Sequence, residues 1–332
     1  MNPEELLYYS QEFRNAGNKF DSSFPYKWLK VEEWGSNKGA YIPLQFFSMD
    51  VDDENYFVFE SSNGVALGSS IYEAKLFALF ELVERDAFLN FWYKKEDYTE
   101  LILILLKKKV QEKIARFETE DKKVYIFDMT FDISIPSILC LAVDFRGKVA
   151  TYISTASHVN YNVAINAAVN ECLVGHRIYE TNPRIGEKEY NSDYDVVEMF
   201  DHVNHASRRE YIKNYDFLFE SEVKTVEELY GSESYKISDS IDDAKDLLDF
   251  ICKTKLNNHG KIYFADLSTK MSYEYGFFVA KIVVSGMLPM TFGYANQRIN
   301  RERIKNAIQN SKYSDRCLCK GDEIDDRAHP FP

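Results

Sequence analysis

The strongest constraint on the fold is the run of residues 71–93, which contains neither proline nor glycine. A run of this length with broad apolar content predicts a long helix. At about 100° per residue, one arc of this helix should face the core. That arc carries Leu76, Leu79, Phe80, Val83 and Ala87. The adjoining arc carries Glu73, Phe77, Glu81 and Glu84. Carboxylates therefore line one edge of the apolar stripe.

Two of these carboxylates, Glu81 and Glu84, lie one helical turn apart, so both could reach a single divalent ion or two neighbouring ions. Carboxylate oxygens suit magnesium when phosphate oxygens fill its remaining positions. Arg85 follows Glu81 by four residues and could pair with it or with a phosphate. Spacing alone leaves a second interpretation open, an amphipathic helix whose acids are solvated and salt-bridged. The aromatic residues that end the run, Phe88, Phe91, Trp92 and Tyr93, are expected to pack in the core.

The rest of the chain mixes strands and helices without a Gly/Ser- or Pro-rich linker, which predicts one α/β or α+β domain over residues 1–332. Strands are expected at 41–44, 56–59, 124–127, 138–143, 262–265 and 277–284. Further helices are expected at 162–180 and 241–254. The polar segment 190–240 is expected to form a surface insertion, and residues 320–332 an extended, proline-containing tail.

The formal net charge of −13 argues against a nucleic-acid partner and against binding to an anionic membrane surface. No window of about twenty apolar residues predicts a membrane span, and residues 1–5 lack the features of a signal peptide. Five cysteines without a regular framework fit a reducing cytoplasm. Cys317 and Cys319 lack the spacing of a zinc knuckle, and His202 and His205 are expected to be solvated rather than metal-bound. The GxxxxGK[ST], GxSxG and HExxH motifs are absent.

Read together, three neighbouring segments resemble the central signature of the YcaO family. They are SNGVALG at 62–68, EA at 73–74 and ELVERDAF at 81–88. Later segments resemble family motifs in the same order: FDMT at 127–130, IP at 135–136, the helix from Ala164 to Glu171, ADLS at 265–268 and VVSGMLPMTFG at 283–293. The final HPFP at 329–332 is similar to the proline-rich end of azoline-forming members.

This resemblance implies a YcaO-type fold of mixed sheets with packed helices, and an azoline-forming, SagD-like cyclodehydratase component that uses ATP and Mg2+. By resemblance, Glu81 and Glu84 would hold magnesium, while Glu73, Arg85 and Glu171 would lie near the nucleotide. The carboxylate of Pro332 would approach the reacting amide as a proton acceptor.

The sequence also departs from the family pattern. Family members carry an earlier GKG loop and an SxxxExxER signature, and neither precedes residue 62 here. The domain is therefore expected to be incomplete at its N-terminus, with an upstream chain supplying that half of the ATP site, or to be an inactive remnant. Ser285, Val174 and Ala328 also replace a usual proline, glutamine and proline.

The resemblance further implies partners. These are a ribosomally made precursor peptide, a leader-binding protein and, later in the pathway, an FMN dehydrogenase, as in the biosynthesis of thiazole- and oxazole-containing microcins and other bacteriocins. Two alternatives remain open at this point. One is a degenerate, non-catalytic YcaO scaffold; the other is YcaO-type thioamide or amidine formation.

Overall fold

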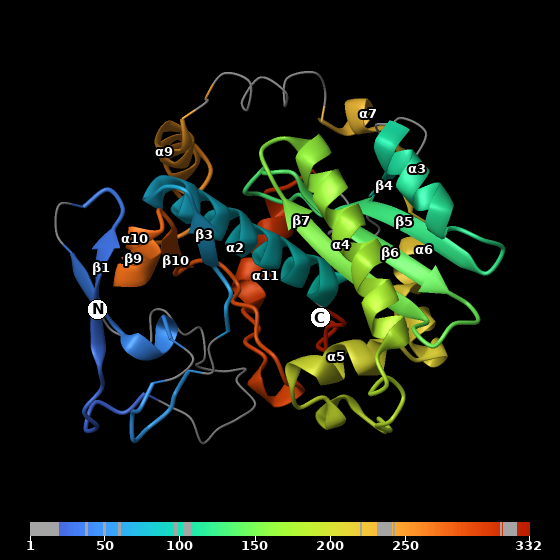
Figure 1. Cartoon of the computed structure of the whole chain (residues 1–332), viewed down its shortest axis with the longest axis horizontal. Coiled ribbons are helices and arrows are strands. Elements are labelled where there is room, and N and C mark those ends of the chain that lie inside the picture. Colours follow the sequence, from blue (N-terminus) through green and yellow to red (C-terminus); the bar gives the residue numbers. More distant parts are fainter. Residues whose placement is uncertain are drawn as a thin grey trace. The chain divides into compact units, whose positions relative to one another are not determined.

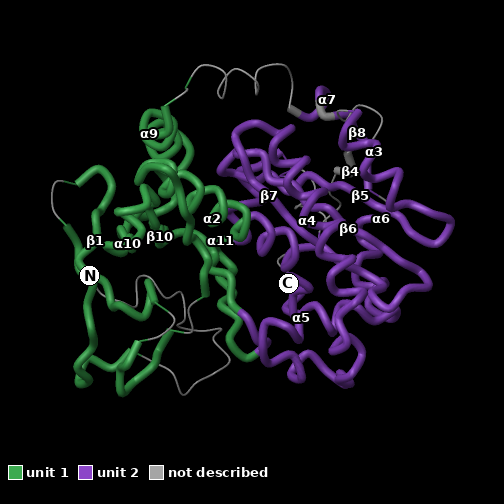
Figure 2. Tube along the Cα trace, viewed as in Figure 1, with its two compact units in different colours: residues 1–86, 241–291, 295–303 green, residues 87–240, 292–294, 304–332 purple. Residues whose placement is uncertain are grey.

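The computed structural model describes residues 20–36, 39–48, 51–58, 61–95, 99–101, 108–219, 221–230, 241, 243–312, 314 and 324–332. They form two compact units, shown in separate colours in Figure 2. Unit 1 comprises residues 1–86, 241–291 and 295–303, and unit 2 comprises 87–240, 292–294 and 304–332. The predictions for Phe59, Cys317, Cys319, 231–240 and 320–323 lie outside the described residues.

Unit 1 is built on an antiparallel sheet in the order β2-β1-β9-β10-β3. Its strands are β1 (Trp28–Glu33), β2 (Ala40–Pro43), β3 (Val65–Gly68), β9 (Ile262–Asp266) and β10 (Phe278–Val284). Its helices are η1 (Leu44–Phe46), α9 (Ala244–Thr254), α10 (Lys270–Glu274) and the first part of α2 (Ile71–Lys94). The predicted helices at 71–93 and 241–254 and the predicted strands near 41, 262 and 277 are thus confirmed.

The second strand predicted near the start of the chain is wrong: residues 56–58 form no strand. Phe57 is fully buried there, but its N–H is taken by the side chain of Gln45 at 3.0 Å instead of by a neighbouring strand. The same amide group of Gln45 also donates to the carbonyl of Asn55 at 2.8 Å. One buried glutamine therefore satisfies backbone groups that a sheet would otherwise satisfy.

Unit 2 is built on a second sheet in the order β7-β6-β5-β4-β8, antiparallel except for the parallel pair β4 and β8. Its strands are β4 (Thr99–Leu101), β5 (Lys122–Asp128), β6 (Ser137–Asp144), β7 (Thr151–Ser157) and β8 (Glu222–Lys224). Its helices are α3 (Lys108–Phe117), α4 (Tyr161–Thr181), α5 (Met199–Ala206), α6 (Asp216–Phe219) and α7 (Val226–Tyr230), with 3-10 turns η3 (Asp193–Asp195) and η4 (Arg209–Tyr215). The 3-10 turn η5 (Tyr294–Asn296) and the helix α11 (Arg301–Gln309) continue from one unit into the other. The strands predicted at 124–127 and 138–143 and the helix at 162–180 are confirmed.

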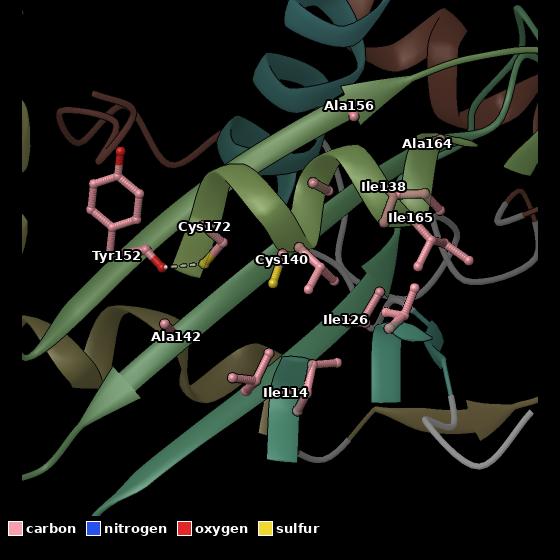
Figure 3. Close-up of a cluster of buried hydrophobic side chains, with 14 of the residues drawn as sticks. Ile114, Ile126, Ile138, Cys140, Ala142, Tyr152, Ala156, Ala164, Ile165 and Cys172 are labelled. Atoms are coloured by element: carbon pink, nitrogen blue, oxygen red, sulfur yellow. Dashed lines mark hydrogen bonds between the residues drawn. The ribbon is translucent and has the colours of Figure 1, made fainter. Parts of the chain in front are cut away.

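The core of unit 2 lies between α4 and the face of the sheet that it covers, as Figure 1 and the close-up in Figure 3 show. Ala164, Ile165 and Cys172 point from α4 toward Ile126, Ile138 and Cys140 on the strands. The small side chains of Ala164 and Ala168 on α4 are buried and allow the helix to pack closely on the sheet.

Strand β7 was not predicted, because its residues read TYISTAS, yet all seven are buried. Three short hydrogen bonds make this burial possible. Thr151 donates to the carbonyl of Ala206 at 2.6 Å, and Ser154 donates to that of Ala168 at 2.5 Å. The hydroxyls of Ser137 and Ser157 lie 2.6 Å apart. Polar side chains that are fully hydrogen-bonded can fill a core strand.

Part of the predicted surface insertion is also buried. In α5 every residue from Asp201 to Ala206 is buried, including both histidines, so the expectation that His202 and His205 are solvated is wrong. The aromatic residues at the end of α2 are buried as predicted. Among the described residues no helix is both long and apolar enough to cross a membrane.

Candidate functional site

The carboxylate helix α2 begins where β3 ends, and a glycine allows the two to approach. A Cβ on Gly68 would lie 2.5 Å from the backbone N of Ala74, so only glycine fits there. Ser70 caps the helix: its carbonyl oxygen accepts the N–H of Ala74, and its hydroxyl oxygen accepts the N–H of Glu73. The carboxylate of Glu73 accepts the N–H and the hydroxyl of Ser69, both at 2.6 Å. These two hydrogen bonds, the hydroxyl first, lower the pKa of Glu73. Glu73 thus serves the start of the helix.

The loop before β3 places backbone N–H groups beside the middle of α2. Two features require glycine at position 64. Its φ is +72°, and a Cβ there would meet the carbonyl oxygen of Ile282 at 2.8 Å. The loop is fixed to β10 by a bond from the N–H of Ile282 to the carbonyl of Gly64 at 2.9 Å. Buried Lys281 also donates to the carbonyl of Ser61 at 3.0 Å.

Glu81 and Glu84 flank one guanidinium. Nη2 of Arg85 lies 3.7 Å from Oε1 of Glu81, and Nη1 lies 3.9 Å from Oε1 of Glu84. The side chains are 24%, 14% and 18% exposed for Glu81, Glu84 and Arg85, so all three are largely sheltered but still reachable. The structure therefore brings these three predicted site residues together.

Glu81 carries a perturbed acidity. Burial raises its pKa, and this effect outweighs Arg85, the backbone N–H groups of Gly64 and Val65, and Lys281, all of which lower it. The SNG loop and the ExxER helix, which the sequence showed as separate motifs, thus meet at one carboxylate. Perturbed carboxyls with specific charge partners are frequent at functional sites.

Asp86, the next acid on α2, has a different role that the sequence did not reveal. Its carboxylate is buried, binds the guanidinium of Arg303 with both oxygens and accepts the N–H of Leu288 at 2.7 Å. A bidentate ion pair with a backbone donor holds the helix to the turn after β10. Asp86 belongs to the ERDA motif, but nothing in that motif indicates its partner, because Arg303 lies 217 residues away in sequence.

The remaining two predicted residues lie in unit 2. Glu171 is on the exposed side of α4, one residue before buried Cys172. Pro332 ends a tail that is largely buried: Ala328, His329 and Phe331 are each at most 2% exposed. The structure thus places Glu171 and Pro332 in one unit and Glu73, Glu81, Glu84 and Arg85 in the other.

The tail is held through its backbone. Three consecutive carbonyls accept hydrogen bonds from side chains of unit 2. The donors are Trp92 Nε1 to Arg327 at 3.1 Å, Tyr211 Oη to Ala328 at 3.0 Å and His202 Nδ1 to His329 at 2.6 Å. Before them, Lys95 pairs with Asp325 at 2.8 Å. None of these donors was predicted as part of the site, because a histidine or tyrosine in a polar segment carries no sign of its distant acceptor.

The donors at Glu81 and Glu84 are carboxylate oxygens beside an arginine, which fits magnesium carried by a phosphate ligand. Among the described residues no three His, Cys, Asp or Glu side chains converge as a complete metal-binding group. Two glutamates supply only part of the oxygen ligands of a magnesium ion. Oxygens of phosphate, of water or of other residues would complete its coordination.

Comparison with solved structures shows similar folds at low identity. A heterocyclase in complex with substrate and cofactor matches with a TM-score of 0.77 and 18% identity, over 100% of this chain and 44% of that one. The E. coli microcin synthetase McbBCD complex matches at 0.68 and 15%, over 100% and 81%. YcaO from Methanopyrus kandleri, bound with AMPPCP and Mg2+, matches at 0.60 and 16%, over 82% and 67%. The chain spans less than half the length of the first heterocyclase.

Comparison with curated protein sequences finds no match. Comparison with protein families matches residues 1–288 to the family described as YcaO cyclodehydratase, ATP- and Mg2+-binding. The chain therefore belongs to the YcaO family of ATP- and Mg2+-binding cyclodehydratases.

Proposed function

We propose that this protein is the cyclodehydratase component that converts Cys, Ser or Thr residues of a ribosomally made peptide to thiazolines or oxazolines. The observation that carries the proposal is the meeting of Glu81, Glu84 and Arg85 beside the N–H groups of the loop at Gly64. Together they form a polar, sheltered group with the carboxylates and the cation that phosphoryl transfer requires.

The reaction needs ATP because an amide oxygen is a poor leaving group. The thiol or hydroxyl of the substrate adds to the preceding carbonyl carbon and loses its proton, and the carbonyl oxygen receives the γ-phosphoryl group of ATP. The C–O bond then breaks, phosphate leaves with that oxygen, and loss of the amide proton forms the C=N bond. The products are ADP, phosphate and the azoline.

In this scheme Glu81 and Glu84 hold magnesium, which when bound would neutralise and orient the phosphate oxygens. Arg85 lies between the two carboxylates, 3.7 and 3.9 Å from them, and its guanidinium is proposed to bind a phosphate oxygen as well. Glu73 and Glu171 are proposed to lie near the nucleotide. For Glu73 this role would come in addition to its hydrogen bonds with Ser69.

The carboxylate of Pro332 is proposed to accept the proton lost from the reacting amide or nucleophile. This is supported by the way the tail is held, with three backbone carbonyls fixed in succession up to residue 329. A terminal carboxylate on a fixed tail has a defined position, which general-base catalysis demands.

We further propose that the protein acts in the cytoplasm with a leader-binding partner and the precursor peptide, within a bacteriocin-type pathway that includes an FMN dehydrogenase. A second polypeptide that contributes further carboxylates to the nucleotide site belongs to the same proposal. Glu81 and Glu84 would supply only part of the octahedral oxygen coordination that magnesium prefers.

The test is Glu84→Gln in the complex reconstituted with partner and precursor peptide. Because the amide keeps the shape but loses the charge, we expect cyclisation, measured as loss of water by mass spectrometry, to fall more than about a hundredfold with little change in the free energy of unfolding. Glu112→Gln on α3 is the matched control; its carboxylate makes only an exposed contact with Lys108 at 4.0 Å and its loss should change neither quantity. Unchanged cyclisation in Glu84→Gln would remove it from the metal site.

A further inference from the structure

The tautomer of His202 is fixed by its two backbone neighbours. Nε2 of its ring accepts the N–H of Gly293 at 2.8 Å, and a backbone N–H can only donate. Nδ1 faces the carbonyl oxygen of His329 at 2.6 Å, and a carbonyl can only accept. The ring must therefore be neutral, with its proton on Nδ1.

The surroundings agree with a neutral ring. His202 is 1% exposed, and its ring stacks on that of His329 with centroids 4.1 Å apart and planes 18° apart. Phe292 packs edge-on against both rings, at 5.6 and 5.8 Å. Burial lowers the pKa of His202 to about 4, although nearby Asp201 and the carbonyl of His329 raise it.

His329 in turn shapes the last residues. Its Nδ1 accepts the N–H of Phe331 at 3.3 Å, and Phe88 of α2 packs against both His329 and Phe331, at 6.1 and 5.0 Å. The stacked pair of histidines fixes the backbone at residue 329, three residues before Pro332, and His202 also accepts the N–H of Gly293.

We propose that His202 is a positioning residue: in its Nδ1–H form it clamps the tail at His329 against Gly293 and thereby sets where the Pro332 carboxylate lies. The inference rests on the proposed function in one respect, the use of that carboxylate in the reaction. The clamp itself is a property of unit 2 and is testable without turnover.

Two substitutions separate the two hydrogen bonds. His202→Asn can keep a donor near the place of Nδ1, toward His329, but loses the acceptor for Gly293. His202→Phe keeps the ring and loses both bonds. The control is His176→Gln on α4, another buried histidine; its Nε2 lies 3.0 Å from the carbonyl of Val149 in the core of the same unit.

Hydrogen exchange of the peptide covering residues 324–331 reports the clamp. We expect exchange to rise about tenfold or more in His202→Phe, less in His202→Asn, and not at all in His176→Gln. Nitrogen NMR of histidine-labelled protein at pH 7 should find the proton of His202 on Nδ1. An Nε2-protonated ring, or tail exchange unchanged in His202→Phe, would overturn the proposal.

Cyclisation by the same variants in the reconstituted complex separates this proposal from the function on which it rests. We expect kcat to fall in the order of tail exchange, and deletion of Pro332 alone to lower kcat while exchange of 324–331 stays unchanged. A loosened tail with full cyclisation would sink the role of Pro332 but support the clamp. A fixed tail with lost cyclisation would overturn positioning by His202.

Discussion

Glu81 and Glu84 of α2 and His202 of α5 are all sheltered from water, but their contacts with neighbouring side chains and backbone groups differ in length. Glu81 and Glu84 touch Arg85 at 3.7 and 3.9 Å, longer than a charge-assisted hydrogen bond. His202 makes two bonds of 2.6 and 2.8 Å that determine its tautomer. Long contacts between charged groups leave room for a charged ligand, whereas short, directional contacts fix a backbone. We therefore propose that Glu81 and Glu84 bind a ligand and that His202 positions the tail.

Short and long contacts also occur side by side on the same helix, as a third carboxylate of α2 shows. Asp86 follows Arg85 directly, but it is buried and bound to Arg303 and to the N–H of Leu288. On α2, therefore, the acids that we propose to bind a ligand and a buried acid that pairs with Arg303 lie within six residues of each other.

The largest effect on stability is expected from Asp86→Asn. The change leaves the buried guanidinium of Arg303 without its charge partner, which should cost about 3–5 kcal/mol of unfolding free energy. Urea denaturation measures it. Removing both partners in Asp86→Leu with Arg303→Met should cost less, because no buried charge is left unpaired. A loss below about 1 kcal/mol in the single variant would place Asp86 with the loosely held acids.

Acidification should change the contributions of His202 and Glu81 to the free energy of unfolding in opposite directions. Burial lowers the pKa of His202 from its ordinary value of 6.5 to about 4 in the folded protein, so between these pH values only the unfolded chain takes up the proton. Its contribution is complete above pH 6.5 and is lost as pH falls toward 4, by roughly 3 kcal/mol. Burial also lowers the pKa of His205 to about 4, so its contribution to the free energy of unfolding is lost over the same pH range. Glu81 has a raised pKa, so its contribution is complete below pH 4.5 and is lost as pH rises.

Urea denaturation across pH 4 to 7 measures this dependence, with His202→Phe as the comparison. The slope of unfolding free energy against pH should be smaller in His202→Phe than in the unchanged protein. Equal slopes would mean that His202 is protonated in the folded state, against the geometry of its ring.

The smallest effect is expected from Glu73→Gln. Loss of charge weakens the two bonds with Ser69 at the start of α2 and should cost about 1 kcal/mol, as for other capping residues. If Glu73 serves only the helix, the Michaelis constant for ATP stays unchanged. A rise in that constant without further loss of stability would move Glu73 from the structural to the binding group.

Local patterns predicted the three longest helices and five of the strands. The helix at 71–93 and the apolar strands at 124–127 and 138–143 follow from periodicity and composition, which act within one element. The failures concern side chains whose partners are far away in sequence. Gln45 replaces a strand beside Phe57, and the serines and threonines of β7 are buried only because distant carbonyls and hydroxyls bind them.

In the candidate site too, contacts within one helix were predicted, whereas contacts between distant parts of the sequence were not. Spacing on α2 brought Glu81, Glu84 and Arg85 together correctly, since one helix fixes their separation. The loop N–H groups at Gly64 and the tail donors Trp92, Tyr211 and His202 depend on tertiary folding, and no local pattern indicates them.

The close approach of Gly68 to Ala74 has a consequence for insertions and deletions. Because β3 meets α2 with no room for a Cβ, the start of the helix is tied to the loop at Gly64. Adding or removing one residue between Gly68 and Glu81 would turn the carboxylate by about 100° and shift it by about 1.5 Å along the axis, away from the loop N–H groups. This stretch can therefore vary in composition at its exposed positions, but its length is fixed.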